Sequence, residues 1–599
     1  MAKVKPPVIY RTKYSEDNVN ELDKEIRETS KVKEQDAQYL VEYPTVYVIN
    51  DQQKKEYTVY VGETNDIQRR TWEHLKNDPK KRNDWRELQS GAEMFVIGHE
   101  HFNKSLTLDI ENRLMQYLSS VDAVKHLNNR RENYQNKYYT HDEMKPIFNK
   151  IWQRLNKEDP KLFPAQRLIE DSALFKASPF NKLTTEQVDA RNIIFQAIQE
   201  ALASGKRDQV ILVKGEAGAG KTVLMSNIFF ELAKNPDLSV KLMVNQSEQM
   251  GVYQQIAEKL GLQMTETEEK RLKQADPEKG KAEAWQQKKV VKTATFIKTV
   301  KPNEPIDLAF IDEAHLLLMQ KNQSYTSDEA NQLIDIIKRA KVTVAIYDEH
   351  QILQARQMME AQDWEKLATY QPQTIQLTNQ MRIVASKDTV DWLRTFIDQR
   401  EILPIPIDDR YELRVFDDPK EMEAAIIEKN EQDQVNGLSR MVATYDWKYS
   451  SQSKPADGYW MVREGDWEMP WNYQLKPTKE QKHTAVKYKD LAWAEQPHTI
   501  EEIGSTYTVQ GMDLNYVGVE IGPSVKYRNG KVIFDPSESA NDKAVNQRTM
   551  KDGSKQSFGE QLLRNELNVL LTRGVHGLYL HAVDPELQAT LKKAYEAKG

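Results

Sequence analysis

The sequence predicts an α/β protein in which a small α/β domain precedes two lobes built on parallel sheets. Three observations lead to this prediction. The chain has 599 residues, enough for roughly four units of about 150 residues each. A β-hairpin pattern begins at Thr45, and from about Leu183 onward helical segments alternate with short β-branched strands. This alternation is typical of parallel sheets, because parallel strands are joined by crossovers of helix length.

Composition indicates a folded protein of the aqueous phase. Hydrophobic residues make up 39% of the chain and charged residues 29%, and the formal net charge is −7, which does not fit a disordered or membrane-embedded chain. No stretch of about 18 residues is free of charge, so we expect no membrane-spanning helix and no membrane partner. The N-terminus lacks the apolar segment of a secretory signal, which favours a cytoplasmic location. The absence of cysteine excludes disulfides and thiolate metal sites.

The first part of the chain predicts a compact domain around a hairpin. Residues 1–40 are rich in charge, and we expect an arm or a helix that packs on a neighbour. Two β-branched and aromatic runs follow, separated by a polar turn at residues 50–53. The predicted elements are strands at 45–49, 57–61 and 94–97, and helices at 66–76, at 105–118 and ending near Leu155.

The rest of the chain predicts two parallel sheets. The first is expected from strands at 210–213, 240–244, 308–311 and 342–346, and the second from strands at 441–444, 517–521 and 577–582. Residues 270–301 are basic and are a candidate insertion. The predicted division is an N-terminal arm 1–40, a small domain 41–155, a linker 156–182 that contains three prolines, a first lobe 183–384, and a second lobe 385–599 with insertions.

The segment from Gly215 to Thr222 fits Gly-x-x-x-x-Gly-Lys-[Ser/Thr] at every fixed position and lies between a strand and a helix. Glycines Gly215, Gly218 and Gly220 allow backbone N–H groups to surround phosphates, and the helix N-terminus adds favourable charge. Lys221 is expected to bind the β- and γ-phosphates, and Thr222 to bind Mg²⁺. This pattern predicts an ATP site, and a chance glycine turn is the weaker interpretation.

An apolar strand ends in Asp312 and Glu313, followed by Ala314 and His315. Asp312 is expected to hold Mg²⁺, and Glu313 to accept a proton from the attacking water. A structural acidic turn is the alternative, but the phosphate loop upstream favours the catalytic interpretation.

Beyond these residues, the motif order resembles that of superfamily 1 helicases and translocases. The segments that carry the resemblance are Thr-Thr-Glu-Gln ending at Gln187, Asp-Glu-Ala-His from Asp312, Tyr-Asp-Glu-His-Gln at 347–351, Leu-Thr-Asn-Gln-Met-Arg ending at Arg382, Gly-Ser-Thr-Tyr-Thr-Val-Gln-Gly-Met-Asp at 504–513, and Leu-Leu-Thr-Arg-Gly around Arg573. The resemblance implies two RecA-like lobes and an adenine contact for Gln187. It implies lobe coupling for Asp348 and Gln351.

The spelling of the later motifs is most similar to that of Schlafen-like helicases, over about residues 181–599. Gln-Met-Arg at 380–382, Thr-Val-Gln-Gly at 508–511 and Leu-Thr-Arg-Gly at 571–574 carry this narrower resemblance. It implies that Arg382 and Arg573 meet Lys221 around one triphosphate. Two arginines so far apart in sequence do this only if two lobes close on the nucleotide.

Two further features have two interpretations each. Base–aromatic stacking contributes about 1–3 kcal/mol per base, so a tryptophan-rich stretch could bind a strand, although buried tryptophans are the more common case. The basic segment 270–301 is either a solvated face or a nucleic-acid contact. The tryptophans concerned are Trp447, Trp460, Trp467, Trp471 and Trp493.

In the first domain, Tyr47 and Tyr60 lie on the two hairpin strands, Arg70 and His74 follow at helical i, i+4 spacing, and Glu111 lies on a later helix. Residues at this spacing share one helix face. One carboxylate suits a hydrated Mg²⁺, and an arginine suits the charge of a phosphodiester transition state. Strand aromatics and a solvated helix face are the structural alternative.

These residues resemble the GIY-YIG nuclease pattern over about residues 41–150, with Thr-Val-Tyr and Tyr-Val-Gly in place of the usual spelling. The resemblance implies one Mg²⁺ or Mn²⁺ on Glu111, water activation by Tyr47 with support from Tyr60 and His74, and phosphate stabilisation by Arg70. Asn128 or Asn129 matches the late asparagine of the family.

Together these patterns predict an ATP-dependent DNA helicase or translocase fused to a metal-dependent endonuclease, with single-stranded or forked DNA as partner. The domain combination suggests restriction or anti-phage defence by analogy alone, with a partner defence subunit or a homo-oligomer as the assembly. Two alternatives stay open. One is an ATP-switched nucleic-acid sensor with an inactive nuclease domain, and the other is an RNA-directed nuclease–helicase.

Overall fold

The computed structural model of the chain describes residues 5–29, 32–53, 56–77, 85, 88, 92–128, 138–170, 172–215, 218–320, 330–377, 383–431, 437–456, 458–479, 481 and 491–597. Its backbone contacts divide the chain into two compact units. The first contains Met1–Leu183 and Gly251–Val290, and the second contains Thr184–Met250 and Val291–Gly599. The predicted fold class, a small α/β domain followed by parallel-sheet lobes, is confirmed.

The first unit contains a five-stranded sheet in the order β1-β4-β2-β3-β5. Only β5 runs parallel to its neighbour, β3, and the other pairings are antiparallel. The predicted hairpin is present, but its strands continue through the polar residues 50–53, so the turn comes later than the sequence suggested. The strands are β1 (Val8–Lys13), β2 (Thr45–Gln53), β3 (Glu56–Thr64), β4 (Glu93–Gly98) and β5 (Val124–Leu127).

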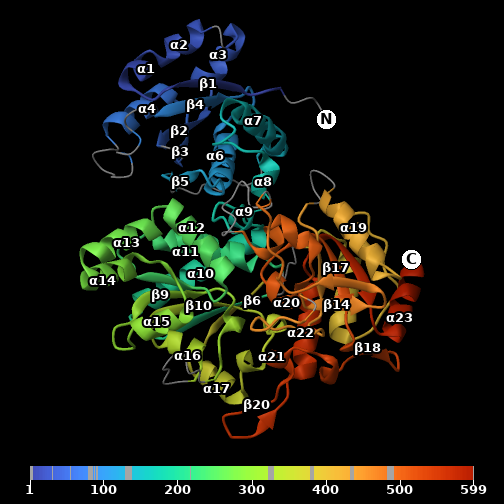
Figure 1. The fold of residues 1–599 in the computed structure, drawn as a ribbon. Coiled ribbons are helices and arrows are strands. Elements are labelled where there is room, and N and C mark those ends of the chain that lie inside the picture. Colours follow the sequence, from blue (N-terminus) through green and yellow to red (C-terminus); the bar gives the residue numbers. More distant parts are fainter. Residues whose placement is uncertain are drawn as a thin grey trace. The chain divides into compact units, whose positions relative to one another are not determined.

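Alternating side chains give this sheet two covered faces, as the pleat of a strand requires. Tyr47 and Ile49 of β2 pack in one core with residues of the N-terminal helices, whereas Val48 lies between them in the alternation and is also fully buried. The helix α6, which carries Glu111, packs on β2, β3 and β5. Figure 1 shows the helices around this sheet. They are α1 (Glu16–Asn20), α2 (Leu22–Glu28), α3 (Glu34–Val41), α4 (Ile67–Lys76), α6 (Lys104–Ser119) and α7 (Met144–Glu158).

Two segments of the first unit are more ordered than their composition suggested. Within residues 1–40, the strand β1 extends the sheet beside β4 in addition to the expected helices. Within residues 156–182, Leu162 and Phe163 are fully buried, and Trp152 Nε1 donates to the Pro164 carbonyl at 2.7 Å. This segment therefore folds against α7, and it contains α8 (Gln166–Glu170) and α9 (Ala173–Lys176).

Residues 251–290 contribute a helical hairpin, α13 (Glu266–Ala275) and α14 (Pro277–Gln287), to the first unit. The buried Lys259 ammonium donates to the carbonyls of Ser119 and Val121, each at 2.9 Å. A cation at the C-terminal end of α6 satisfies carbonyls that the helix leaves unpaired.

The second unit begins with a six-stranded sheet in the order β11-β6-β10-β9-β7-β8. The four strands expected here are present, and the registered pairs are parallel. The strands are β6 (Gln209–Gly215), β7 (Val240–Met243), β8 (Val290–Val291), β9 (Ile306–Ile311), β10 (Ala340–Tyr347) and β11 (Gln373–Leu377). Its helices are α10 (Thr185–Ala203), α11 (Lys221–Ala233), α12 (Ser247–Lys259), α15 (Thr293–Thr299), α16 (Gln332–Ile337) and α17 (Ala361–Thr369).

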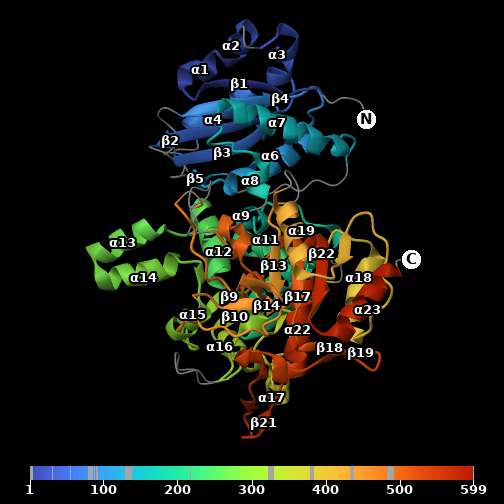
Figure 2. The ribbon, with the colours of Figure 1, turned by 45° about the vertical axis from the view of Figure 1, so that its right-hand side comes forward.

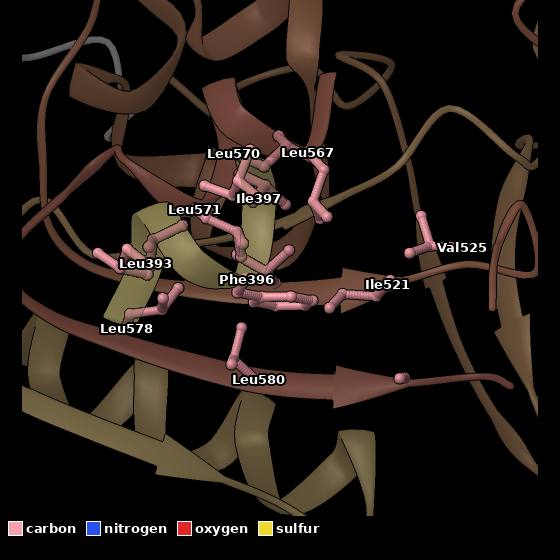
Figure 3. Packing of buried hydrophobic residues seen from close by; sticks show 14 of the residues in the cluster. Leu393, Phe396, Ile397, Ile521, Val525, Leu567, Leu570, Leu571, Leu578 and Leu580 are labelled. Carbon is pink, nitrogen blue, oxygen red and sulfur yellow. The ribbon is translucent and has the colours of Figure 1, made fainter. Parts of the chain in front are cut away.

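A second parallel sheet follows in the order β12-β22-β17-β13-β16. Figure 3 shows its core, where Phe396 and Leu567 meet strand residues such as Leu578. The strands are β12 (Glu412–Val415), β13 (Arg440–Ala443), β16 (Gly504–Ser505), β17 (Leu514–Ile521) and β22 (Gly574–Ala582). Its helices are α18 (Lys387–Arg394), α19 (Pro419–Glu431), α20 (Thr506–Val509), α21 (Asp542–Val545), α22 (Gly559–Leu571) and α23 (Pro585–Glu596).

Three short hairpins decorate the second sheet (Figure 2). The hairpin of β20 and β21 extends beside α17, where the Lys551 ammonium contacts Asp363 at 2.5 Å. The hairpins are β14 (Met461–Glu464) with β15 (Trp467–Pro470), β18 (Val525–Arg528) with β19 (Lys531–Phe534), and β20 (Arg548–Thr549) with β21 (Lys555–Gln556).

The tryptophan-rich stretch belongs to the core of this second region. Trp467, Trp471 and Trp493 are 8%, 0% and 4% exposed, and Trp447 and Trp460 pack partly buried against the same core. The interpretation of the first three as core residues is confirmed, and base stacking is wrong for them. Over the described part of the chain, no helix is both long and apolar enough to cross a bilayer.

A buried ion pair joins the two central strands of the second sheet. His581 Nδ1 lies 2.9 Å from Glu520 Oε1, and the side chains are 7% and 0% exposed. Burial alone would lower the pKa of His581, but the Glu520 carboxylate outweighs it and raises that pKa. For the Glu520 carboxyl group, burial disfavours the charged form and so raises the pKa.

Because the pKa of His581 is raised in the folded state, the stability that its charged form contributes is present below the unfolded pKa of histidine, about 6.5, and is lost as pH rises through the folded value. We expect Glu520→Gln to lower the free energy of unfolding by about 3 kcal/mol near pH 6. We expect a smaller loss near pH 9. Urea unfolding followed by fluorescence at several pH values tests this. Equal losses at every pH would contradict it.

Candidate active sites

The phosphate loop connects β6 to α11. Gly218 and Gly220 have φ angles of 87° and 71°, a left-handed conformation that side chains with a Cβ adopt only with strain. Gly215 lies close to β11, where an added Cβ would be 3.0 Å from the Leu377 carbonyl oxygen. The glycine pattern is therefore explained by backbone geometry. Residues 216–217 of the loop lie outside the described chain.

Lys221 begins α11, and its ammonium is buried inside this loop. Nζ donates to the Gly215 carbonyl at 2.6 Å and to Asp348 Oδ2 at 2.9 Å. Burial would raise the pKa of Asp348, but the charge of Lys221 and the hydrogen bonds from Lys221 and Gln351 outweigh it and lower that pKa. A buried cation thus has a buried carboxylate beside it. Thr222, in the first turn of α11, is partly buried.

At the end of β9, Glu313 adopts a left-handed backbone conformation with φ 52° and ψ 52°. Such a conformation costs about 1–3 kcal/mol in a residue with a side chain, and it is concentrated at functional sites. Glu313 Oε2 is buried and has no hydrogen-bond partner among the described residues. The preceding carboxylate, Asp312, accepts a hydrogen bond from Gln249 at 2.8 Å.

His315 is a further buried group near these carboxylates. Its Nε2 lies 3.3 Å from Glu313 Oε2, and neither ring nitrogen has a hydrogen-bond partner in the described chain. Burial lowers the pKa of His315, so we expect a neutral ring. The sequence singled out this histidine only as part of its motif.

Asp348 and Gln351 connect the first sheet to Arg573 of the second. Gln351 Nε2 donates to Asp348 Oδ2 at 2.7 Å, and Gln351 Oε1 accepts from Arg573 Nη2 at 3.2 Å. Arg573 is 0% exposed, and its other nitrogens donate to the Val569 and Met512 carbonyls. Lys221, Asp348, Gln351 and Arg573 therefore form one continuous hydrogen-bonded chain, which we call the buried relay.

Three amide side chains from helices and loops of the second sheet donate hydrogen bonds to the backbone of the segment that contains Gln351. Asn565 Nδ2 donates to the carbonyls of Glu349 and Ile352, each at 2.9 Å. Asn568 Nδ2 donates to the His350 carbonyl, and Gln510 Nε2 donates to the Gln351 carbonyl. Gln510 lies in the predicted motif at 504–513, whereas the sequence predicted no role for Asn565 or Asn568. The i, i+3 spacing of Asn565 and Asn568 just before the final motif is the available signal.

Two predicted site residues need separate comment. Gln187 is buried, its Oε1 accepts from Thr184 N in a capping box, and its Nε2 donates to the Gly220 carbonyl at 3.2 Å. Its amide therefore contacts the phosphate loop, and its contact with adenine stays a prediction. Arg382 lies outside the described residues.

Tyr347 occupies the position where the helicase motif usually has glycine. Its ring is 3% exposed and lies edge-on to Trp364 of α17, with ring centroids 5.7 Å apart. The aromatic partner accommodates a large side chain at the end of β10.

In the first unit, Tyr47 and Tyr60 bring two aromatic rings within 6.0 Å of each other. The Tyr47 hydroxyl lies 2.7 Å from His74 Nε2 of α4. Burial and the neighbouring Tyr60 raise the pKa of Tyr47 well above its usual value. A neutral Tyr47 hydroxyl can therefore donate its proton to the imidazole.

Arg70 and Glu111 place opposite charges beside these tyrosines. Arg70 Nη1 bonds Glu73 at 2.8 Å. Desolvation would lower the pKa of Arg70, but Glu73 and the two tyrosines outweigh it and raise that pKa. Glu111 is 5% exposed. Desolvation raises the pKa of Tyr60, and the charge of Glu111 adds to this rise.

Trp85 is a residue of this site that the sequence analysis missed. Its ring stacks on His74 at 4.1 Å between centroids and 16° between planes, and it also contacts Tyr60 at 4.5 Å. Trp85 is 1% exposed. It follows a polar, charged stretch with no periodic pattern, so no local signal indicated burial.

The donor set limits how a metal ion could bind here. In the ranges that the structure describes, no group of three or more His, Cys, Asp or Glu side chains could hold a metal ion. Glu111 is thus a single buried carboxylate beside two tyrosines and an arginine, which fits a hydrated hard cation that keeps several waters. Asn128 is buried after β5, and Asn129 lies outside the described chain.

Two protein-family models match this chain, and each covers one of the two sites. The model of the GIY-YIG catalytic domain matches residues 43–128. The model of the Schlafen group 3 DNA/RNA helicase domain matches residues 208–584, more than half of the chain. The chain belongs to the Schlafen group 3 helicase family. The predicted fusion of a GIY-YIG domain to a Schlafen-like helicase is thereby confirmed.

The chain is also similar to a yeast protein and, more distantly, to a solved structure. The uncharacterized protein YPL245W of Saccharomyces cerevisiae is 26% identical over 448 residues, which cover 68% of this chain and 90% of the yeast protein. A solved structure of Pif1 helicase, from work on DNA unwinding at forked double-stranded DNA, is 12% identical. It covers 70% of this chain and 98% of its own, with a TM-score of 0.24.

The amides of α22 yield a stability prediction for this Schlafen group 3 protein. Asn565→Ala leaves two buried carbonyls unpaired, each at a cost of about 1–3 kcal/mol. We expect faster hydrogen exchange in residues 348–353 and a lower melting temperature. Asn192→Ala, at an exposed position of α10, is the control. Unchanged exchange in 348–353 would show that α22 does not hold this segment.

Proposed function

We propose that this protein hydrolyses ATP to translocate along or unwind DNA, and that its GIY-YIG domain is a metal-dependent endonuclease. The observation that carries the first part is the buried relay, because it joins the phosphate-loop lysine to an arginine of the other sheet. The enclosed tyrosine–histidine pair beside Arg70 and Glu111 supports the second part. We also propose that the chain is divided into an N-terminal arm 1–40, a nuclease domain 41–155, a linker 156–182, a first lobe 183–384 and a second lobe 385–599.

ATP binding is expected to rearrange the buried relay. The Lys221 ammonium exchanges Asp348 for the β- and γ-phosphates, which carry more negative charge than one carboxylate. Arg573 stabilises charge that develops on the γ-phosphate, together with Arg382. Glu313 Oε2, which has no hydrogen-bond partner in the described chain, accepts the proton of the attacking water.

The residues around Lys221 also fit a magnesium ion, since the Thr222 hydroxyl and the Asp312 carboxylate are oxygen ligands of the kind that Mg²⁺ prefers. Bound there, the ion would neutralise phosphate charge. Movement follows from the connection of Gln351 to α22. When Lys221 and Arg573 turn to the triphosphate, the bonds at Gln351 change, and Asn565 and Asn568 transmit that change to the second sheet.

In the nuclease domain, His74 accepts the proton of Tyr47 as the tyrosine activates a water molecule. Arg70 stabilises the additional charge on the phosphodiester. Glu111 would hold the metal ion, Mg²⁺ or Mn²⁺, which polarises the phosphate and lowers the pKa of bound water. Tyr60 and Trp85 enclose His74 and limit access of bulk water.

The biological role is proposed on the domain combination alone, as restriction or anti-phage defence in the cytoplasm, with a partner defence subunit or self-assembly. The family description names both DNA and RNA, so RNA is the second candidate substrate. Strand preference is tested by comparing ATPase stimulation by single-stranded DNA, forked DNA and RNA.

The nucleotide site predicts two separable losses. We expect Lys221→Ala to lose both ATP binding and ATP hydrolysis, because it removes the phosphate contact. We expect Arg573→Ala to bind ATP but to hydrolyse it about a thousandfold more slowly, as for other arginines that stabilise the transferring phosphoryl group. Fluorescent-nucleotide binding and phosphate release measure these effects, with Lys234→Ala at the other end of α11 as control. Turnover by Lys221→Ala would refute the assignment.

The nuclease site predicts loss of cutting without loss of the motor. Glu111→Gln keeps the shape of the side chain and removes its charge, so we expect no nicking of supercoiled plasmid in Mg²⁺ or Mn²⁺ and unchanged ATP hydrolysis. Glu158→Gln, on a half-exposed side chain of α7, is the matched control. If the intact protein never nicks DNA or RNA while it hydrolyses ATP, the sensor alternative is favoured.

A further inference from the structure

A cavity of about 520 Å³ lies in the second unit, away from the residues of the buried relay. Elements that follow the strands of the first sheet form one wall, and the segment from α21 to β20 forms the other. This volume is in the range of cavities that hold small ligands. The lining residues are Gln320, Ala355, Arg356, Lys543, Asn546, Gln547, Arg548 and Thr549.

Two cations, Arg356 and Lys543, line opposite walls of this cavity and lie close enough to repel each other. Arg356 is exposed, and its Nε donates to Gln354 Oε1 at 2.8 Å. The Lys543 ammonium lies over the Tyr507 ring, 4.8 Å from the centroid. Desolvation lowers the pKa of Lys543, and the charge of Arg356 lowers it further. Among the described residues, neither cation forms an ion pair, so their mutual repulsion is unrelieved.

The third cation of the cavity, Arg548, already donates hydrogen bonds from both of its terminal nitrogens. Its guanidinium donates to the carbonyls of Ala355 and Met319, each at 3.0 Å, and to Glu360 Oε1 at 2.9 Å. It is 5% exposed. Arg548 therefore holds the two walls together, and Arg356 and Lys543 remain for a ligand.

The other polar groups complete a site for phosphate oxygens. Asn546, Gln547 and Thr549 are exposed and bring amide and hydroxyl donors, and none of the described residues that line the cavity is acidic. An anion placed between Arg356 and Lys543 would remove their repulsion and gain charge-assisted hydrogen bonds. The chemistry of the cavity is thus that of a phosphate ester.

We propose that this cavity binds a phosphodiester group of a single nucleic-acid strand. The inference rests on the proposed function, in which a strand must be held by elements of both sheets while ATP is hydrolysed elsewhere. ATP itself has its own site at Lys221. A phosphodiester carries one negative charge and no base information, so this contact positions the strand without selecting its sequence.

The test is the binding of a fluorescently labelled oligonucleotide by the full-length protein, followed by anisotropy at several salt concentrations. We expect the double variant Arg356→Gln/Lys543→Gln to bind about tenfold more weakly, by a similar factor for different sequences. The slope of log affinity against log salt should fall by about 0.7 for each phosphate contact that is lost. The two single variants should each give part of the effect.

The control is Lys593→Gln, which removes an exposed charge from α23 on the same unit. ATP hydrolysis in the absence of nucleic acid should be unchanged in all these variants, which shows that they are folded. Equal affinity and equal salt slope in the double variant and the intact protein would overturn the inference.

A second arm separates a strand from a free anion. Inorganic phosphate and AMP are titrated by calorimetry into the intact protein and the double variant. If the double variant no longer binds inorganic phosphate or AMP but still binds the strand, the cavity is a site for free phosphate and the inference is overturned. If the intact protein binds no strand with ATP, with ADP or without nucleotide, the proposed function fails instead.

Discussion

The buried ion pair between Lys221 and Asp348 is the constraint from which the nucleotide site follows. An ammonium taken out of water needs a partner, since leaving a buried charge unpaired costs several kcal/mol. Asp348 supplies that partner through Oδ2, which also accepts a hydrogen bond from Gln351, while its Oδ1 accepts from the His350 amide. Gln351 also accepts a hydrogen bond from Arg573. The ion pair of Lys221 is therefore connected to a residue more than three hundred positions later in the chain.

The GIY-YIG domain also orients a buried polar side chain, but it does so without a salt bridge. Here His74 lies between the Tyr47 hydroxyl and the Trp85 ring, so hydrogen bonding fixes one edge of the imidazole and stacking fixes its face. A ring held in this way keeps one orientation, which a proton acceptor needs. In both sites a polar side chain is oriented by buried neighbours that come from other elements.

The sequence predicted what depends on local pattern. The phosphate loop, the carboxylates after β9 and seven of the eleven strands in the two parallel sheets were visible as spacing and β-branched runs. Trp85 was not visible, because its burial depends on packing against α4. The β1 strand was missed because its side chains alternate weakly at the edge of the sheet. The capping box of Gln187 with Thr184 is local, but the bond of Gln187 to Gly220 and the bonds of Asn565 and Asn568 to residues 349–352 are tertiary contacts, whose partners sequence spacing alone does not specify.

Arg548 has a mechanical consequence for the two sheets. Its guanidinium comes from the hairpin of β20 and β21. It donates to the backbone carbonyls of Ala355 and Met319 and to the Glu360 carboxylate. Any rotation of one sheet against the other must either break this set of bonds together or leave it intact and turn about it. If the bonds stay intact, Arg548 lies on the axis of the rotation, and the displacement of each atom grows with its distance from that axis.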